Sequence, residues 1–286
     1  MPFFARPSFE TETKSDVDMA RGKAKQDRFT RPRPNRLLCA GHSHIRRLES
    51  YLVEKERREA GSLNFKIMRQ QLTSSFAGIG GARVKHLLPP SEAEEKRVRA
   101  SKNQSAIALF EKHKSFAKTF QNAFELNRPH SLALWIGDND ITSLDDGRLP
   151  QEIAEELAFH IMAQATAVKN KFGIQEVFII QLLPRYLTTR SRSSASEISR
   201  YNAIAFLVNR VIYNEALSMG LNKHHLGFIF PAEDVDEKRY LEMRCYFDDE
   251  GVHLNNEGYA KASQALRHIA IRTAKSDGTR QRDDRH

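Results

Sequence analysis

Two side chains near opposite ends of the sequence have the chemistry of a nucleophile and its base. Ser43 follows a short apolar run, residues 37–40, and a glycine. A serine hydroxyl is a poor nucleophile at neutral pH and needs a base to activate it. His253 has an acid three residues before it, Glu250, and one tight turn can bring that carboxylate to the imidazole. By itself, Ser43 also fits the N-cap of the helix that follows.

Two further positions can supply hydrogen-bond donors to a developing oxyanion. Gly81, in the pair Gly80-Gly81, allows close approach of the backbone to a ligand. Asn139 follows a buried strand, and its amide can donate to a negatively charged oxygen. Taken singly, these residues fit a loop and a turn. The nucleophile elbow Gly-x-Ser-x-Gly is absent, because Ile45 stands where its second glycine would be.

The elements that must position these residues alternate between strands and helices. Apolar runs predict strands, and apolar residues at helical spacing predict helices. The expected strands are 37–40, 65–68, 131–136, 176–182 and 227–230, and the main helices are 45–53, 150–172, 196–219 and 258–274. The strands are continuous apolar runs, which indicates burial on both faces. We therefore expect an α/β fold, a three-layer αβα sandwich with a mostly parallel sheet, whose strands end at one shared edge.

The motifs gain specificity from their order along the chain: Gly-x-Ser, a glycine pair, Gly-x-Asn-Asp and acid-x-x-His. This order resembles the SGNH (GDSL-like) hydrolase superfamily over residues 37–274. The resemblance implies a flavodoxin-like sheet and cleavage of a carboxylic ester through an acyl-enzyme. It implies Ser43 as the nucleophile, His253 as the base, and Ser43, Gly81 and Asn139 as the oxyanion hole. We expect no cofactor and no metal.

Three features depart from the family pattern. His42 stands where the family has the aspartate of Gly-Asp-Ser. Glu250 stands where the family usually has aspartate, and its extra methylene makes Asp249 a rival for orienting His253. The charged segment 89–128 is longer than a strand–helix–strand link requires and reads as a helical insertion. These departures leave open a second interpretation, a catalytically weak or inactive domain of the same fold that is used for binding.

The charge of the chain is concentrated near its start. The 286 residues carry 45 Lys and Arg against 36 Asp and Glu, a net charge of +9, and 40% are apolar, enough for a folded core. We expect a disordered basic arm at 1–35, one domain at 36–274 and a disordered tail at 275–286. Because a basic arm can neutralise phosphates, nucleic acid stays open as a partner beside a small ester substrate, as in some mobile-element proteins.

The remaining features concern compartment and ligand. No apolar run approaches the ~20 residues of a membrane span, and residues 1–7 hold no apolar signal region. Two cysteines, Cys39 and Cys245, cannot make a disulfide framework, so we expect an intracellular protein and a buried, unreactive Cys39. The segment 185–193 follows a strand and carries three arginines, which could contact an anionic substrate or nucleic acid.

Overall fold

A six-stranded sheet organises the part of the chain that the structure describes. The computed structural model describes residues 36–59, 65–67, 70–144, 147–224 and 243–283. The strands lie in the order β2-β3-β1-β4-β5-β6. Their bounds are Arg36–Gly41 (β1), Phe65–Ile67 (β2), Gln70–Gly78 (β3), Ser131–Trp135 (β4), Glu176–Ile180 (β5) and Asn222–His224 (β6). All pairs are parallel except β2 with β3.

The order of the parallel strands identifies the topology. Counted along the chain, the five parallel strands have the order 2-1-3-4-5, which is the flavodoxin-like order. The predicted fold class, a three-layer α/β sandwich with a mostly parallel sheet, is confirmed. In this topology β3 is added on one side of β1, and β4, β5 and β6 are added on the other side. Ligands bind at the carboxyl ends of the strands near this switch point, between β1 and β4.

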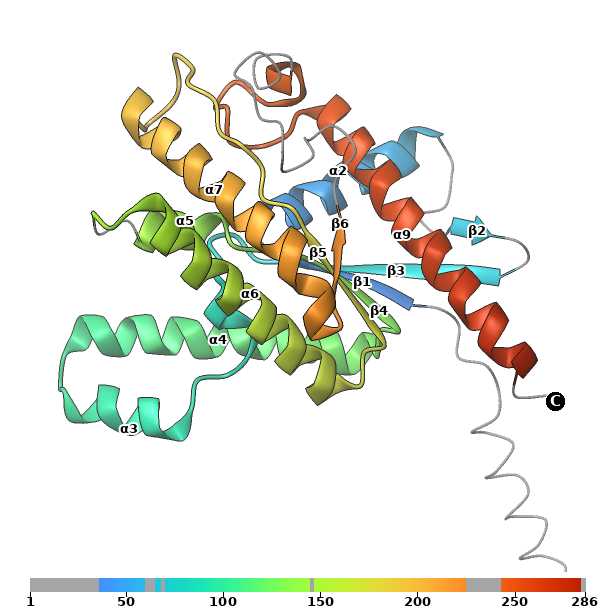
Figure 1. Ribbon diagram of the computed structural model, residues 1–286, viewed down its shortest axis with the longest axis horizontal. Coiled ribbons are helices and arrows are strands. Elements are labelled where there is room, and N and C mark those ends of the chain that lie inside the picture. Colours follow the sequence, from blue (N-terminus) through green and yellow to red (C-terminus); the bar gives the residue numbers. More distant parts are fainter. Residues whose placement is uncertain (1–35, 60–64, 68–69, 145–146, 225–242, 284–286) are drawn as a thin grey trace, which may run out of the picture. The chain divides into compact units, whose positions relative to one another are not determined.

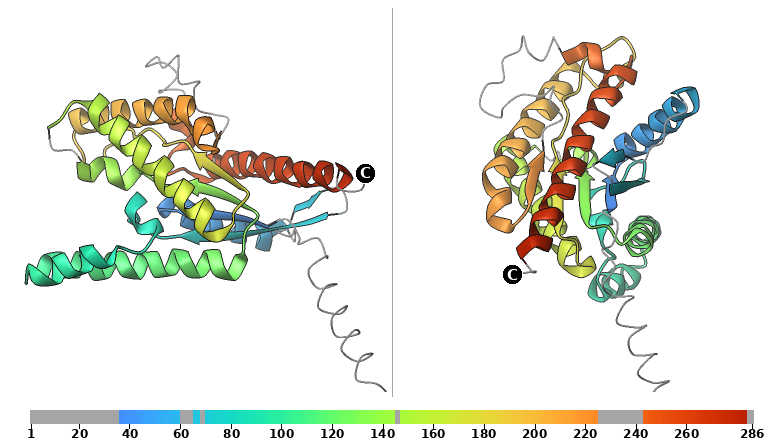
Figure 2. Two further views of the ribbon diagram at one scale, coloured as in Figure 1. Left: turned by 60° about the horizontal axis from the view of Figure 1, so that its bottom comes forward. Right: turned by 90° about the vertical axis from the view of Figure 1, so that its right-hand side faces the viewer.

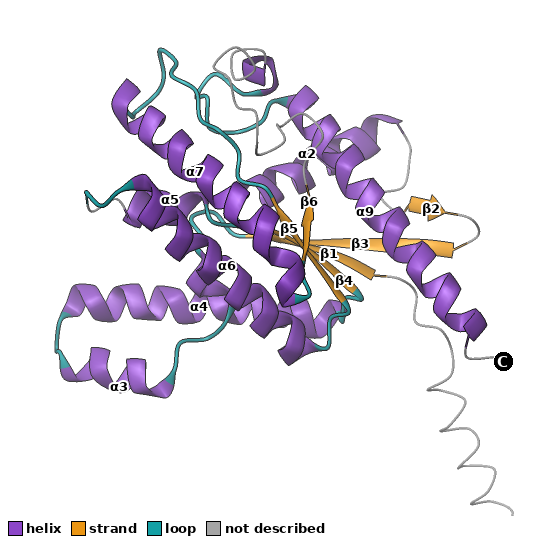
Figure 3. Ribbon diagram, in the orientation of Figure 1, coloured by secondary structure: helices purple, strands orange, loops and turns teal. Residues whose placement is uncertain are grey.

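Helices cover both faces of the sheet (Figure 1, Figure 3). The α-helices are α2 (Ser43–Glu59), α3 (Glu92–Ala100), α4 (Gln104–Asn127), α5 (Asp138–Leu144), α6 (Pro150–Phe172), α7 (Ala195–Glu215) and α9 (Asn256–Asp283). Three short 3₁₀ helices are η1 (Val84–Leu87), η2 (Ala216–Met219) and η3 (Arg244–Tyr246). One buried cluster joins the sheet to α4, α6 and α7, and a second joins it to α2 and α9.

Alternation along the central strands explains why two cores form. In β1, Leu38 faces the cluster under α4, α6 and α7, while Leu37 and Cys39 face the cluster under α2 and α9. In β4, Leu132 faces the cluster under α4, α6 and α7, and Trp135 faces the cluster under α2 and α9. Successive side chains of a strand point to opposite faces, so a strand covered on both sides must be apolar at every position. Burial raises the pKa of the Cys39 thiol to about 12, which fits the expected unreactive residue.

The strand beside β1 is not the one that the sequence predicts. Residues 65–67 form the short antiparallel β2, whereas the neighbour of β1 is β3, at Gln70–Gly78. The sequence of β3, Gln-Gln-Leu-Thr-Ser-Ser-Phe-Ala-Gly, contains no long apolar run. The strand lies next to the short edge strand, and Ser74, Ser75 and Phe76 are only half-buried, so burial does not require apolar residues there.

The segment 89–128 forms two helices that fold back on each other, α3 and α4 (Figure 2). The second helix also belongs to the core, because Phe110, Phe120 and Phe124 are buried. An apolar stripe drawn from the sequence would include Leu109, but that side chain is 67% exposed. Consecutive residues of a helix lie about 100° apart, so Leu109 and Phe110 cannot both face the sheet.

The closing helix is longer than predicted. It runs to Asp283 and so takes in residues 275–283, which the sequence analysis assigns to a disordered tail. Adding residues to an existing helix costs far less than starting one, so a polar extension can remain helical. The predicted arm at 1–35 and the predicted strand at 227–230 lie outside the described residues. Within the described ranges, no helix combines the length and apolarity needed to cross a membrane.

Candidate active site

The carboxyl end of β1 leads directly into the candidate site. Gly41 ends the strand, and Ser43 is the first residue of α2. The turn between them is tight: His42 N donates to the Trp135 carbonyl at 3.1 Å, and a Cβ on Gly41 would lie 1.9 Å from that same oxygen. Only glycine fits at position 41, and the turn that it allows places Ser43 at the sheet edge.

The structure brings Ser43 and His253 together. Ser43 Oγ lies 3.0 Å from His253 Nε2, although 210 positions separate the two residues in the sequence. The segment that carries His253 is a turn: Asp248 N donates to the His253 carbonyl at 2.8 Å, and Gly251 N donates to the Asp248 carbonyl at 3.0 Å. Tyr186, just after β5, donates its backbone N–H to the Gly251 carbonyl at 2.8 Å. These backbone bonds hold the imidazole against the start of α2.

Asp248, five residues before the histidine, lies nearest to its second ring nitrogen. Asp248 Oδ2 is 3.8 Å from His253 Nδ1, and its Oδ1 accepts the backbone N–H groups of His253 at 3.4 Å and Glu250 at 3.1 Å. Arg47 on α2 pairs with Oδ2 of the same carboxylate at 3.2 Å. Asp248 was not among the acids predicted from the sequence. The signal was available, because Asp248 and Gly251 occupy the first and fourth positions of a turn, where aspartate and glycine are favoured.

The two acids named from the sequence lie in different places. The Asp249 carboxylate is 80% exposed and pairs with Arg190 at 3.2 Å, so it faces the surface. Glu250 is exposed, but its carboxylate lies within 4.8 Å of the ligand atoms of Asp248 and His253. Among the described residues, no group accepts a hydrogen bond from His253 Nδ1. Both Asp248 and Glu250 are therefore close enough to act on the imidazole electrostatically.

The surroundings of His253 favour its neutral form. Burial lowers the pKa of His253, and the Arg47 charge lowers it further, to about 4, although Asp248 and Glu250 act in the opposite direction. A neutral imidazole at pH 7 has a lone pair on Nε2 that can accept the Ser43 proton. The site therefore holds the pair in the protonation state that a general base requires.

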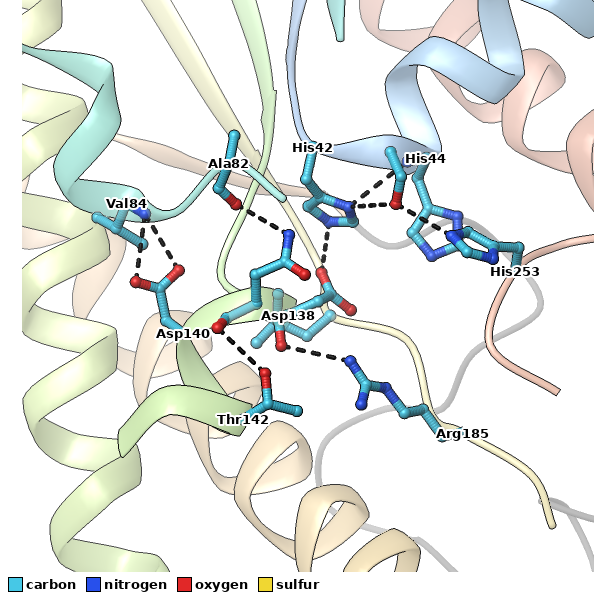
Figure 4. Close-up of polar contacts among 12 residues, drawn as sticks. His42, His44, Ala82, Val84, Asp138, Asp140, Thr142, Arg185 and His253 are labelled. Carbon is cyan, nitrogen blue, oxygen red and sulfur yellow. Dashed lines mark hydrogen bonds and ion pairs between the residues drawn. The ribbon is translucent and has the colours of Figure 1, made fainter. Parts of the chain in front are cut away.

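A second histidine lies on the other side of the serine. His42 is buried, its Nε2 is 2.5 Å from Asp138 Oδ2, and its Nδ1 is 3.5 Å from Ser43 Oγ (Figure 4). The backbone N–H of His44 approaches His42 Nδ1 at 3.4 Å. If Nδ1 accepts this bond, the ring proton is on Nε2 and faces Asp138. This pair was missed in the sequence, where an unusual histidine and an acid 96 positions away carry no local signal.

Asp138 is held as a carboxylate by its neighbours. Burial alone would raise its pKa, but the charge and hydrogen bond of His42, the His44 ring and the Tyr201 hydroxyl lower it below its ordinary value. Tyr201 on α7 donates to Asp138 Oδ1 at 2.8 Å. The buried acid therefore links the serine turn, through His42, to α5 and α7.

The loops that carry the predicted oxyanion donors are tied to each other. Asn139 Nδ2 donates to the Ala82 carbonyl at 2.9 Å, directly after Gly81 (Figure 4). Gly81 has φ +74°, in the region that glycine favours, and the space where a Cβ would stand is open. An amide nitrogen carries two hydrogens, so Asn139 keeps one donor for a ligand. Nearby, Asp140 accepts the Val84 N–H at 3.1 Å, and burial raises the pKa of Asp140 to about 6.

One group among the described residues has the donor types of a cation site: Asp248, Glu250 and His253, whose ligand atoms lie within 4.8 Å of one another. Two of these residues, Asp248 and His253, already have other partners. The Arg47 guanidinium neutralises Asp248, and Ser43 Oγ contacts His253 Nε2. The cluster is therefore better described as an imidazole with two nearby carboxylates.

The comparisons with known proteins give similarity to solved structures only. No family model matches the chain, and no curated protein matches it. It is similar to a GDSL-like lipase from Bacteroides thetaiotaomicron, with 12% identity over 90% of this chain and 98% of that one, at a TM-score of 0.47. It is also similar to the lipase/acylhydrolase from Enterococcus faecalis, with 12% identity over 83% and 96% of the two chains, at a TM-score of 0.44.

A third similar structure is a catalytic mutant of an acetylxylan esterase from Geobacillus stearothermophilus. It is 12% identical over 82% of this chain and 94% of that chain, at a TM-score of 0.45. At these identities the likeness is one of fold.

Proposed function

We propose that this chain is a serine hydrolase of the SGNH type that cleaves a carboxylic ester through an acyl-enzyme. The observation that carries the proposal is the 3.0 Å approach of Ser43 Oγ to His253 Nε2, at the carboxyl edge of a parallel sheet. Two elements far apart in the sequence are held there by backbone hydrogen bonds and a glycine that nothing else can replace. Such a pair is the minimal nucleophile and base for acyl transfer.

The proposed reaction has two halves. Ser43 Oγ attacks the ester carbonyl carbon while His253 Nε2 takes the hydroxyl proton. The N–H groups of Ser43, Gly81 and Asn139 stabilise the tetrahedral oxyanion. The bond to the alcohol oxygen breaks, and the imidazolium protonates the leaving alcohol. Water, deprotonated by His253, then attacks the acyl-enzyme and releases the acid and Ser43.

The carboxylates beside His253 have a role in this scheme. The imidazolium formed during attack is positively charged, and both Asp248 and Glu250 favour that form. Asp248 is anchored by three donors, which include Arg47, whereas Glu250 lies exposed. We assign the main electrostatic support of the imidazolium to Asp248, with Glu250 as a second contributor.

A fluorophosphonate probe tests the nucleophile. The probe loses fluoride when an activated serine oxygen attacks phosphorus, which leaves a stable covalent adduct. We expect one adduct, located by peptide mass spectrometry on the peptide that contains Ser43, and none in the Ser43→Ala variant. An adduct that persists in Ser43→Ala, or a protein that stays unlabelled, contradicts the proposal and favours a binding domain of the same fold.

The pH dependence of ester hydrolysis is expected to reflect the lowered pKa of His253. A protonated imidazole cannot accept the serine proton, so kcat/KM should hold its plateau through pH 6 and fall as the pH drops through about 4. Arg47→Gln removes a positive charge that lowers this pKa, so the acidic limb should move to higher pH. Initial rates for p-nitrophenyl acetate, measured between pH 3.5 and 8 after brief exposure to each pH, give the acidic limb of the wild type and of Arg47→Gln.

The matched control for this prediction is Arg210→Gln on α7. Arg210 is exposed and lies outside the site, so its loss changes the net charge equally without moving the limb. A wild-type limb near the ordinary histidine value, or equal limbs in wild type and Arg47→Gln, would contradict the assignment of His253 as the base.

A further inference from the structure

A cavity adjoins the segment that carries His253. It has a volume of about 280 Å³ and is lined by the loop after β5, by the first turn of α7 and by Glu250 and Val252. Val252 directly precedes His253, so the cavity borders the segment that carries the imidazole. In acyl transfer the imidazolium protonates the leaving alcohol, so the alcohol part of an ester must lie on that side of the site. The cavity is therefore a candidate for the place where the alcohol part binds.

The charge of the lining is strongly one-sided. Arg185, Arg190 and Arg192 contribute to the wall, and Glu250 is its one acidic residue among the described residues. Arg190 pairs with Asp249 outside the wall. Neither Arg185 nor Arg192 has a carboxylate partner in the part of the chain that the structure describes. The cavity therefore presents positive charge that no carboxylate among the described residues neutralises.

Arg185 is held in place before any ligand arrives. Its guanidinium lies over the Tyr201 ring, 3.9 Å from the ring centre. Its Nη2 points to the Asp138 carbonyl at 3.5 Å (Figure 4). Its backbone N–H and C=O both bond to the Asn202 side chain, at 2.7 and 2.9 Å. A guanidinium has five N–H donors, so these contacts leave most of them for a ligand. A planar fork of this kind matches a carboxylate, which it can bind through two parallel hydrogen bonds.

We propose that Arg185 binds a carboxylate on the alcohol part of the ester, so that the preferred substrates are esters of carboxylate-bearing alcohols or phenols. This inference rests on the proposed function, because it names the class of ester that the same site cleaves. A half-buried guanidinium with no carboxylate partner among the described residues carries a desolvation cost, and a ligand carboxylate would offset it. Arg192, which is exposed, adds longer-range attraction.

The kinetic test compares two esters that differ mainly in charge, 4-acetoxybenzoate and its neutral methyl ester. Each kcat/KM is divided by the rate of hydrolysis by hydroxide, which removes the difference in intrinsic reactivity. We expect the wild type to prefer the carboxylate by about tenfold or more, the range of a charge-assisted hydrogen bond. Arg185→Gln should bring the ratio close to one, and Arg210→Gln should leave it unchanged. High salt should lower the wild-type ratio.

A binding test covers the case in which turnover fails. Isothermal titration of the same two compounds into Ser43→Ala protein, with and without Arg185→Gln, measures recognition independently of catalysis. Tighter binding of the carboxylate that disappears with Arg185 supports the inference. Hydrolysis of both esters without preference overturns the inference and leaves the proposed function intact. Hydrolysis of neither ester contradicts the proposed function, and equal binding of the two compounds overturns the inference.

Discussion

Replacing Ser43 by alanine is expected to lower kcat/KM for p-nitrophenyl acetate by about 10,000-fold or more, to the level that binding and oxyanion donors sustain alone. The reason is chemical: no other described oxygen lies as close to His253 Nε2, so the variant has no group to form the acyl-enzyme. Ser43 is the first residue of α2, where alanine is tolerated in the helix, so the fold should persist.

The matched control for Ser43→Ala is Ser50→Ala on the same helix. The Ser50 hydroxyl is exposed and bonds back to the Arg46 carbonyl at 3.1 Å, away from the site. Its loss should leave turnover within about twofold of wild type, since it touches none of the proposed machinery. Steady-state assays of both variants and the wild type compare their kcat/KM, and circular dichroism checks that each protein is folded. Comparable turnover by Ser43→Ala and wild type would remove Ser43 from the reaction.

The two buried acids of α5 are expected to respond in opposite ways to loss of charge. Asp138→Asn removes the anion that faces His42 Nε2 and accepts from Tyr201, and it should lower the free energy of unfolding at pH 7 by about 2 kcal/mol, the range of a hydrogen bond to a charged group. Asp140→Asn should leave stability equal or higher, because burial disfavours the Asp140 charge and an amide oxygen can still accept the Val84 N–H. Urea unfolding of both variants measures the difference.

The dependence on pH sharpens this comparison. The lowered pKa of Asp138 stabilises the fold fully above the unfolded-state pKa near 4, and that stability is lost as the pH falls from there through the lower pKa of the folded state. The raised pKa of Asp140 has the reverse effect, so its contribution falls as the pH rises from about 4 to about 6. Equal losses of stability in the two variants at pH 7 would show that the Asp138 charge beside His42 does not stabilise the fold.

The sequence predicted what depends on regular spacing. The strands around residues 131–135 and 176–180 and the helix at 150–172 follow from apolar periodicity and the handedness of parallel crossovers. The meeting of Ser43 with His253 was implied by the order of the motifs and the family that it resembles. What it missed depends on contacts. The sequence of β3 is largely polar, and Ser74, Ser75 and Phe76 are half-buried, so no apolar pattern marks this strand. Asp248 reaches His253 through a turn rather than at the expected spacing of three.

The His42–Asp138 contact shows a different limit. His42 departs from the Gly-Asp-Ser of the family that the sequence resembles, and this departure favoured the interpretation of a binding domain. In the structure, Asp138 from α5 lies against that histidine. A pairing across 96 positions has no trace in one sequence, because no local spacing connects the two residues.

The separation of Ser43 from His253 by 210 positions has a consequence for how the chain can be divided. The nucleophile stands at the start of α2, whereas the base comes three residues before α9, so a cut anywhere in the long stretch between them leaves each fragment with only half of the pair. Two such fragments, expressed separately, would be inert until they reassemble, and regained ester cleavage would report that reassembly.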